Sequence, residues 1–494
     1  MNVAALFYLA APALLFLANF VMPLLGIPLA IALLALLIHA AFVRRQQPTA
    51  RAPLLPEVTN NLLLAGGVIS LMGFATGHYC WDWIKHWALL NSLESRPWPV
   101  ELDLQGNLGY LRFYIGAYLV PAGVAHATGW NIAVCTALWY GAGLVLAFTL
   151  LCRDSDINGI RLSLLWVTPL LLCMAGADAW LDMLPRPEGS VISVTGFHHE
   201  WWANALLNHP VQYGSPLCML IWVPHQAIPT FVAVGLLRRL KSTTDIGPCV
   251  VAVSMLALWS PYALIGSLLL LVPHLLGKSA LRNALLKTQW ATQAAIVFAL
   301  AFAALMAWTL SHEMPTGGLC LDCAPARLAN PAPYLAFLLV ELAIPLLILR
   351  RRLFDEPTSI AAVLALCTLP WIGGSVPDAV MRISMPALIY LFVRCAHDIA
   401  QRTVRQRAAL ILLMLLVAGP TAWGEATFHF EGGSRHRTLP PSDPLSSPSY
   451  TVWATRTTYS AKEFFDICGW KWRPQYFTFT PPPTWPNTPQ AARR

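Results

Sequence analysis

The feature that most constrains the fold of this chain is a series of apolar runs separated by short basic clusters. A helix needs about 20 apolar residues to cross the hydrocarbon of a bilayer, or somewhat fewer when the helix is short. Such runs lie at residues 4–22, 25–43, 61–80, 161–179, 215–237, 247–262, 264–277, 289–310, 334–350, 358–375, 378–395 and 408–424. We therefore predict an all-α fold, a polytopic bundle of transmembrane helices.

The composition excludes an ordinary soluble protein. Of the 494 residues, 57% are hydrophobic and only 11% are charged, whereas about a quarter of the residues of a soluble domain are charged. The net charge of +8 arises from Arg and Lys in short clusters between apolar runs. That pattern is typical of membrane topology and not of a nucleic-acid-binding face, so we expect no nucleic-acid partner.

The basic clusters also predict the direction of each span, because Lys and Arg collect in cytoplasmic loops. Clusters lie within residues 44–51, 238–241, 278–287, 350–352 and 394–407. Stepping between them places residues 81–109, 180–214 and 311–333 on the far side.

Residues 110–151 contain two apolar stretches where an odd number of crossings is required. The first is interrupted by Gly116, Pro121 and Gly123 and is interpreted as re-entrant or interfacial, while the second spans. The total is about 13 spans, with the N-terminus inside and the C-terminus outside.

Two parts of the chain follow from composition. Residues 1–424 form the transmembrane domain, and residues 425–494 form a Pro- and Trp-rich tail, which we interpret as a small lid or embellishment on the far side. Cys320 and Cys323 also lie on that side, and we expect them to form a short disulfide in an oxidising compartment.

The stretch HYCWDWIKHWALLN, residues 78–91, carries Asp82, Lys85 and His86 where an apolar run ends. Charged groups are costly at membrane depth, so their presence indicates a function. The alternative is an interfacial anchor, since Trp collects at membrane surfaces and Lys extends outward to water. An anchor explains Lys85 but leaves Asp82 without a reason.

Further polar residues lie in the other far-side segments. His199 and Gln212 belong to the second loop, and His225 and Gln226 lie a few turns into the next span. Asp378 and Arg382 are spaced i and i+4 at the start of another. That spacing puts the last two on one helix face. Either could be structural instead, Asp378 with Arg382 as a local ion pair and His225 as a satisfied polar group beside a helix break. We predict that these groups converge at one leaflet.

No P-loop, serine elbow or dinucleotide-binding fingerprint occurs in a suitable context. Energy for a reaction would therefore come from an activated substrate. The run His198, His199 and Glu200 has the ligand types of a divalent-metal site, but adjacent ligands in a loop are a weak signal. We predict no cofactor, with a divalent metal at this run as the alternative.

Three stretches carry a resemblance: WDWIKHWALLNSLESRPWP with the following LRFYIGAYLVPA, then QYGSPLCMLIWVPHQAIPT, and GGSVPDAVMRISMPAL. In this order they resemble the recurring motifs of bacterial membrane proteins related to the GT-C superfamily of glycosyltransferases. The similarity covers most of the membrane part and stops before the tail. Pro377 stands where many relatives carry Asn next to the acid.

The resemblance implies a function. It would be a glycosyltransferase of the bacterial inner membrane that moves a sugar from a polyprenyl-phosphate-linked donor to an envelope glycan or lipid acceptor at the periplasmic face. Asp82 matches the acid of the first loop and would be the catalytic base. The expected substrate-binding residues are Lys85, His86, His199, Gln212, His225, Asp378 and Arg382, with Lys85, His86 and Arg382 facing the donor phosphate.

Two alternatives from other classes remain. A transporter or flippase of lipid-linked saccharides would bind the same phosphate without breaking a bond, and inverted repeats would favour it. A non-catalytic component of a polysaccharide assembly would use the tail as its docking element.

Overall fold

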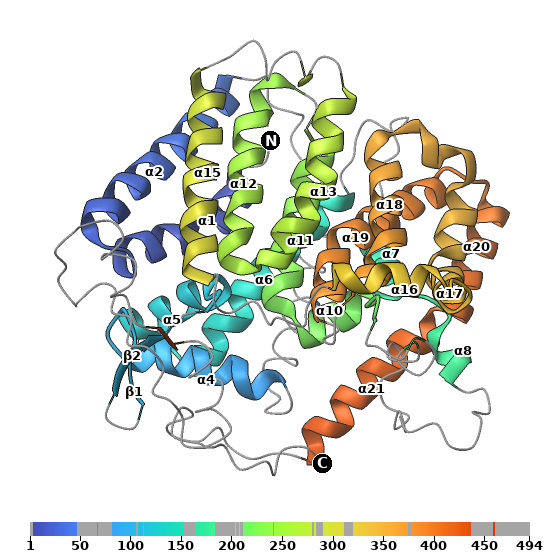
Figure 1. Ribbon diagram of the computed structural model, residues 1–494, viewed down its shortest axis with the longest axis horizontal. Coiled ribbons are helices and arrows are strands. Elements are labelled where there is room, and N and C mark those ends of the chain that lie inside the picture. The colour runs from blue at the N-terminus through green and yellow to red at the C-terminus, as the bar shows by residue number, and fades with distance from the viewer. Residues whose placement is uncertain are drawn as a thin grey trace.

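The computed structural model describes residues 3–46, 67, 82–104, 107–111, 113–152, 164–182, 203, 207, 211–240, 242–278, 281–282, 290–310, 320–373, 378–435 and 458–459. This part of the chain is a helical bundle with one small sheet beside it (Figure 1). The α-helices are α1 (Val3–Asn19), α2 (Pro23–Gln46), α4 (Asp82–Ser95), α5 (Gly116–Thr128), α6 (Ile132–Cys152), α7 (Leu164–Leu172), α8 (Asp178–Asp182), α10 (Pro216–Trp222), α11 (Pro224–Arg238), α12 (Ile246–Trp259), α13 (Pro261–Gly277), α15 (Trp290–Leu310), α16 (Ala324–Leu328), α17 (Ala332–Leu349), α18 (Pro357–Ile372), α19 (Asp378–Ala400), α20 (Val404–Val417) and α21 (Gly419–Arg435). Short 3₁₀ helices are η2 (Thr243–Asp245), η3 (Leu321–Cys323) and η4 (Arg350–Asp355).

Among the described residues, five helices are long and apolar enough to cross a membrane: α2, α6, α15, α17 and α19. A sixth is reached if α20 and α21, which meet at a bend of 44°, count as one broken span. The apolar helices α1, α12, α13 and α18 are shorter. The fold is thus compatible with the predicted membrane protein, while the number of 13 spans stays a prediction. Residues 61–80, predicted as a span, lie outside the described residues except for Gly67.

Three predicted spans are interrupted, which corrects the sequence analysis. Residues 215–237 form α10 and α11, residues 161–179 form α7 and the start of α8, and residues 408–424 form α20 and the first turns of α21. Pro224 has no N–H to continue a helix and clashes with the preceding turn, so α10 ends before it. Gly176 and Gly419 lie at or beside the other two interruptions, where glycine favours a break in the helix. Hydropathy measures apolar length and does not detect such breaks.

The same limit applies to residues 110–151. The second stretch forms α6, a helix of spanning length, whereas the first forms α5, which has only 13 residues. Helix α5 ends at Gly129, which adopts a left-handed conformation with φ of 70° that glycine accommodates without strain. The two stretches therefore differ in helix length: the second is long enough to span a membrane, and the first is not.

The predicted all-α bundle is accompanied by one small sheet, which the sequence analysis did not expect. Strands β1 (Glu101–Leu104) and β2 (Asn107–Leu111) pair antiparallel, and β3 (Thr458–Tyr459) pairs antiparallel with β2. Strand β3 belongs to the tail, so Thr458 and Tyr459 lie beside the strand that precedes α5, while the side of the membrane stays a prediction. Helix α21 runs across residue 424, where the sequence analysis placed the boundary between the two parts.

Helix α19 is the centre of the bundle. Within its spanning segment 94% of the residues are buried, against 22% for α2 at the periphery, and α19 packs on α11, α13, α17 and α18. A side chain at Gly266 of α13 would overlap the carbonyl oxygen of Ile383 and the ring of Pro386. This close approach of α13 and α19 holds the first turns of α19, which include Arg382, inside the protein.

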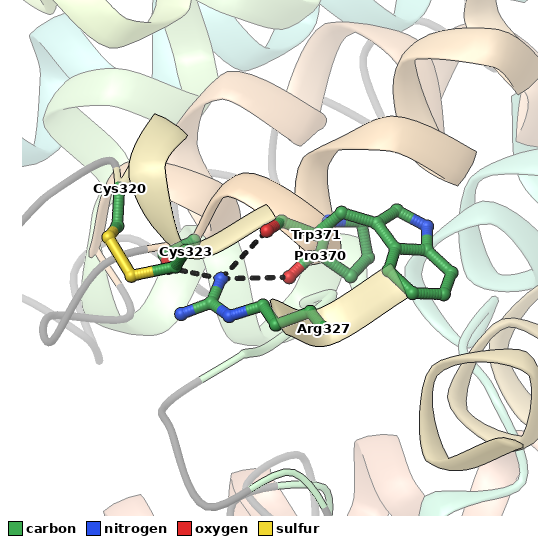
Figure 2. The surroundings of a disulfide bond; sticks show 6 residues. Cys320, Cys323, Arg327, Pro370 and Trp371 are labelled. Carbon is green, nitrogen blue, oxygen red and sulfur yellow. Dashed lines mark hydrogen bonds between the residues drawn. A yellow bond between two sulfur atoms is a disulfide. The ribbon is translucent and has the colours of Figure 1, made fainter. Parts of the chain in front are cut away.

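The disulfide between Cys320 and Cys323 is confirmed, with 5.3 Å between the two Cα atoms. Figure 2 shows that it lies beside the C-terminal end of α18. The N–H of Cys320 donates to the carbonyl of Ile372 at 2.8 Å. Nη1 of Arg327 donates to the carbonyls of Trp371 and Gly373 at 2.9 and 2.5 Å. The disulfide-bonded turn thus satisfies backbone carbonyls at the end of α18.

At the opposite end of the bundle, three of the predicted cytoplasmic clusters meet. Asp398 is 2% exposed and pairs with Arg352 at 2.9 Å and Arg402 at 2.7 Å. Nη2 of Arg238 lies 3.4 Å from Nδ1 of His397. Because these residues come from different loops yet touch, their assignment to a common side agrees with the packing.

Candidate functional site

The candidate site begins with two helix junctions that lie next to each other. Helices α10 and α11 meet at Val223, and α12 and α13 meet at Ser260. The Ser260 hydroxyl accepts a hydrogen bond from the N–H of Ala263 at 3.3 Å and donates to Oε1 of Gln226 at 2.9 Å. One serine therefore caps α13 and joins the two junctions through a buried side chain.

Gln226 extends the network to two further elements. Its Nε2 donates to the hydroxyl of Tyr114 at 3.3 Å and lies 2.9 Å from Nε2 of His225. An amide nitrogen can only donate, so this ring nitrogen of His225 accepts and a neutral imidazole would carry its proton on Nδ1. Gln226 and His225 are both fully buried. Moving any member of this network would break a hydrogen bond in the protein interior, where an unpaired polar group is costly. The hydrogen bonds therefore fix the position of each member.

Arg382 places a positive charge in the same network. It is 6% exposed, its Nη1 donates to the Tyr114 hydroxyl at 3.1 Å, and its guanidinium carbon lies 5.9 Å from the centre of the Tyr262 ring. The Tyr114 hydroxyl thus accepts from both Arg382 and Gln226. A guanidinium held in this way is suited to an anion with planar or tetrahedral oxygens, such as a phosphate.

His86 forms the other half of the cluster. Its Nε2 lies 3.4 Å from the carbonyl oxygen of Trp222, and its Nδ1 lies 2.7 Å from the hydroxyl of Tyr118. Since a carbonyl only accepts, Nε2 of His86 carries a proton, and in the neutral ring Nδ1 accepts from Tyr118. The rings of His86 and His225 are 4.6 Å apart. The structure therefore brings three of the predicted residues, His86, His225 and Arg382, into one cluster.

Other predicted residues are placed only in part. Asp82 is the first residue of α4, one turn before His86, Lys85 lies in the same turn, and Asp378 is the first residue of α19. The side chains of these three residues and all of His199 lie outside the described part. Gln212 is buried, and its described contact is from Nε2 to Sγ of Cys218 at 3.8 Å.

Several members of the cluster were missed from the sequence. Tyr114, just before α5, and Tyr118, in its first turn, bring two hydroxyls into an apolar stretch, which could have signalled them. Ser260 precedes Pro261 in the pattern of a helix cap, whereas Gln226 had been noted beside His225. The residue types were visible, but their meeting depends on how α5, α11 and the junction of α12 with α13 pack together.

A second group of buried polar residues lies on α8, α17 and α21. Oε2 of Glu341 and Oδ1 of Asp178 are 2.5 and 2.8 Å from the position that a Cβ at Gly176 would take, so both buried carboxylates lie next to this glycine. Glu425, also buried, accepts from Nε1 of Trp222 at 3.3 Å. Because Trp222 also contacts His86, this group adjoins the first. A carboxylate within an apolar run such as FLLVELAIPL could have signalled Glu341.

Within the described side chains, no group of three or more His, Cys, Asp or Glu residues is arranged to hold a metal ion. The run His198, His199 and Glu200, considered above for a divalent metal, lies outside the described residues.

The fold and site together define a helical bundle compatible with a membrane protein, with a buried cationic cluster at junctions between short helices. No protein-family model matches the chain, and no curated protein matches it either.

Proposed function

We propose that this protein is an inverting membrane glycosyltransferase of the GT-C type, with a polyprenyl-phosphate-linked sugar as donor and a glycan or lipid as acceptor at the periplasmic face of the bacterial inner membrane. The observation that carries the proposal is the burial of Arg382 beside the hydrogen-bonded side chains of Tyr114 and Gln226, at the junctions of α10 with α11 and α12 with α13. A buried cation in an apolar bundle is expensive and is retained where it binds a substrate or an ion.

The proposed chemistry is a single displacement. The acceptor hydroxyl attacks the anomeric carbon and gives its proton to a carboxylate, for which Asp82 is the candidate. The new carbon–oxygen bond forms as the bond to the lipid phosphate breaks, and the phosphate leaves with the electron pair. Arg382, held by Tyr114, would stabilise the negative charge that grows on that phosphate. His86 and His225 would orient the sugar or the phosphate.

The place of Asp82 in the sequence supports its proposed role as the catalytic base. It begins the helix whose next turn carries His86, and His86 lies against His225 in the cluster. Lys85 belongs to the same first turn of α4 and stays a candidate for the phosphate. The proposal does not need a metal, since fixed cations can take over charge stabilisation.

The test compares lipid-linked glycans by mass spectrometry in cells that carry the gene, lack it, or express Asp82→Asn. We expect a glycan one sugar shorter and an accumulated lipid-linked donor in the latter two strains. Asp322→Asn, an exposed acid in η3, serves as the matched control and should leave the glycans unchanged. Full transfer by Asp82→Asn would remove Asp82 as the base.

Three further measurements separate the other classes: the side of the membrane that carries the glycan, the effect of removing the tail, and sugar transfer by the purified protein. A flippase would change only the side of the membrane on which the glycan is found and not its mass. For an assembly component, removal of residues 425–494 would stop glycan assembly, and the purified full-length chain would transfer no sugar.

A further inference from the structure

A cavity of about 410 Å³ lies at the end of the bundle opposite the candidate site. Its walls come from the N-terminal parts of α1, α12 and α15 and the C-terminal half of α2, which lie side by side in Figure 1. The lining residues are Leu6, Leu36, Leu37, His39, Ala40, Val43, Thr244, Gly247, Pro248, Val251, Trp290, Ala291, Thr292 and Ala295. Its volume falls in the range of small-ligand pockets, about 300–1,000 Å³.

The inner walls are apolar. Leu36, Leu37 and Val251 line them, and small residues such as Gly247 and Ala295 keep the space open. Protein interiors are otherwise packed to the density of organic crystals, and an empty apolar space forfeits dispersion contacts. An apolar occupant would recover those contacts, which favours a hydrocarbon chain over water.

The membrane lipids around α2 would supply such a hydrocarbon chain. The cavity is bounded by α2, a predicted membrane span of which only 22% is buried. On the outer face of this helix Leu34, Ile38 and Phe42 are exposed, as expected for contact with lipid. A chain from the adjacent leaflet could enter beside α2 without crossing a polar surface.

One end of the cavity is polar. Thr244, His39 and Trp290 lie there, and the rings of His39 and Trp290 are 5.4 Å apart. Tryptophan and polar groups of this kind gather at the depth of lipid headgroups. This end therefore corresponds to the membrane interface.

The same end is rich in positive charge. In the sequence of α2, Arg44 and Arg45 follow the lining residue Val43, whereas Asp245 is the acid that follows Thr244. The N-terminus of α12 adds a partial positive charge. The arginines exceed the carboxylate, so an anionic headgroup is favoured over a neutral one.

We propose that this cavity binds one acyl chain of an anionic phospholipid of the cytoplasmic leaflet, with the lipid phosphate beside the C-terminal end of α2 and the N-terminal end of α12. The limited volume favours a single acyl chain over a long polyprenyl chain. The site is distinct from the proposed donor site and does not depend on the glycosyltransferase proposal.

The test uses the full-length protein in phosphatidylcholine vesicles with a trace of phosphatidylglycerol that carries a photoreactive diazirine in one acyl chain. After illumination, mass spectrometry of peptides locates the adducts. We expect them on α2 and α15 at lining residues such as Leu36 and Ala295. Photoreactive phosphatidylcholine with the same chain should label these positions several-fold less. Equal labelling by the two probes would overturn the anionic assignment.

Leu36→Trp should fill the cavity and reduce this labelling several-fold. Leu34→Trp is the matched control, because Leu34 lies on the same helix, is exposed and does not line the cavity; its labelling should equal that of the wild type. Equal labelling of the two variants would refute the cavity as the binding site. If Leu36→Trp fails to fold, Ala40→Phe replaces it. Stronger competition by unlabelled polyprenyl phosphate than by phosphatidylglycerol would overturn the phospholipid as occupant.

Discussion

The most direct test of the candidate site is Tyr114→Phe, which removes one hydroxyl and keeps the ring. That hydroxyl accepts hydrogen bonds from Nη1 of Arg382 at 3.1 Å and from Nε2 of Gln226 at 3.3 Å. A hydrogen bond from a charged donor contributes about 1.5–3 kcal/mol and a neutral one about 0.5–1.5 kcal/mol. The variant should therefore lose about 2–4 kcal/mol of stability, since both buried donors lose an acceptor.

Tyr8→Phe is the matched control. Tyr8 is also buried in the bundle, but its hydroxyl has no hydrogen-bond partner in the structure as described. Its removal takes away an unsatisfied polar group and should leave stability unchanged or slightly raised. The ring of Tyr8 stacks on Trp139, and the phenylalanine ring of the variant should keep this packing.

The assay is thermal or denaturant unfolding in detergent, followed by a thiol-reactive dye that reports exposure of buried cysteines such as Cys249. In a transfer assay, loss of the charged hydrogen bond should also raise the donor concentration for half-saturation by roughly tenfold to a hundredfold. Equal stabilities of Tyr114→Phe and Tyr8→Phe would refute the argument that the Tyr114 hydroxyl holds Arg382 in place.

Three further predictions follow from other parts of the molecule. Gly266→Ala should destabilise the protein by about 1–3 kcal/mol, because the added methyl overlaps the Ile383 carbonyl and overpacking has this cost. Gly419→Ala is the control and should leave the stability unchanged, since nothing lies near its new methyl. Equal thermal stability of the two variants would contradict the close packing of α13 on α19. Cys320 and Cys323 should resist alkylation in membranes isolated without reductant and react after reduction, as measured by mass-tagged maleimide, because they form a disulfide; labelling of both before reduction would argue against an oxidising compartment. Burial raises the pKa of Glu356, but Arg394 at 3.2 Å and the hydrogen bond from Tyr390 at 2.5 Å outweigh it and hold the pKa below its usual 4.5. This ionised carboxylate stabilises the fold at pH values above its unfolded-state pKa, and the stabilisation is lost as the pH falls through its folded-state pKa. Between pH 6 and 3, the stability of the wild type should therefore fall more steeply with pH than that of Glu356→Gln. Identical dependence of stability on pH in the two proteins would exclude this contribution.

Much of the bundle could be predicted from the sequence because a membrane span is a local property. The apolar runs at 25–43, 289–310 and 378–395 correspond to α2, α15 and α19, since length and hydropathy suffice to identify a long apolar helix. The break at Val223 was considered only as an alternative and the one at Ser260 only as the gap between two apolar runs, although each residue precedes a proline. Proline interrupts some membrane helices and only bends others, so the tertiary context decides.

Residue chemistry alone singled out His86, His225 and Arg382, because ionisable and imidazole groups are rare in apolar runs and stand out in any composition. What only the tertiary structure decided is which neutral groups hold them. Tyr114 and Arg382 are 268 residues apart, and Trp222 and Glu425 are 203 apart. Such pairs are set by how helices pack across the whole bundle, and no period or spacing along one segment encodes that packing. The small sheet that joins β2 to the tail was missed for the same reason, because a strand partner more than 300 residues away leaves no local pattern.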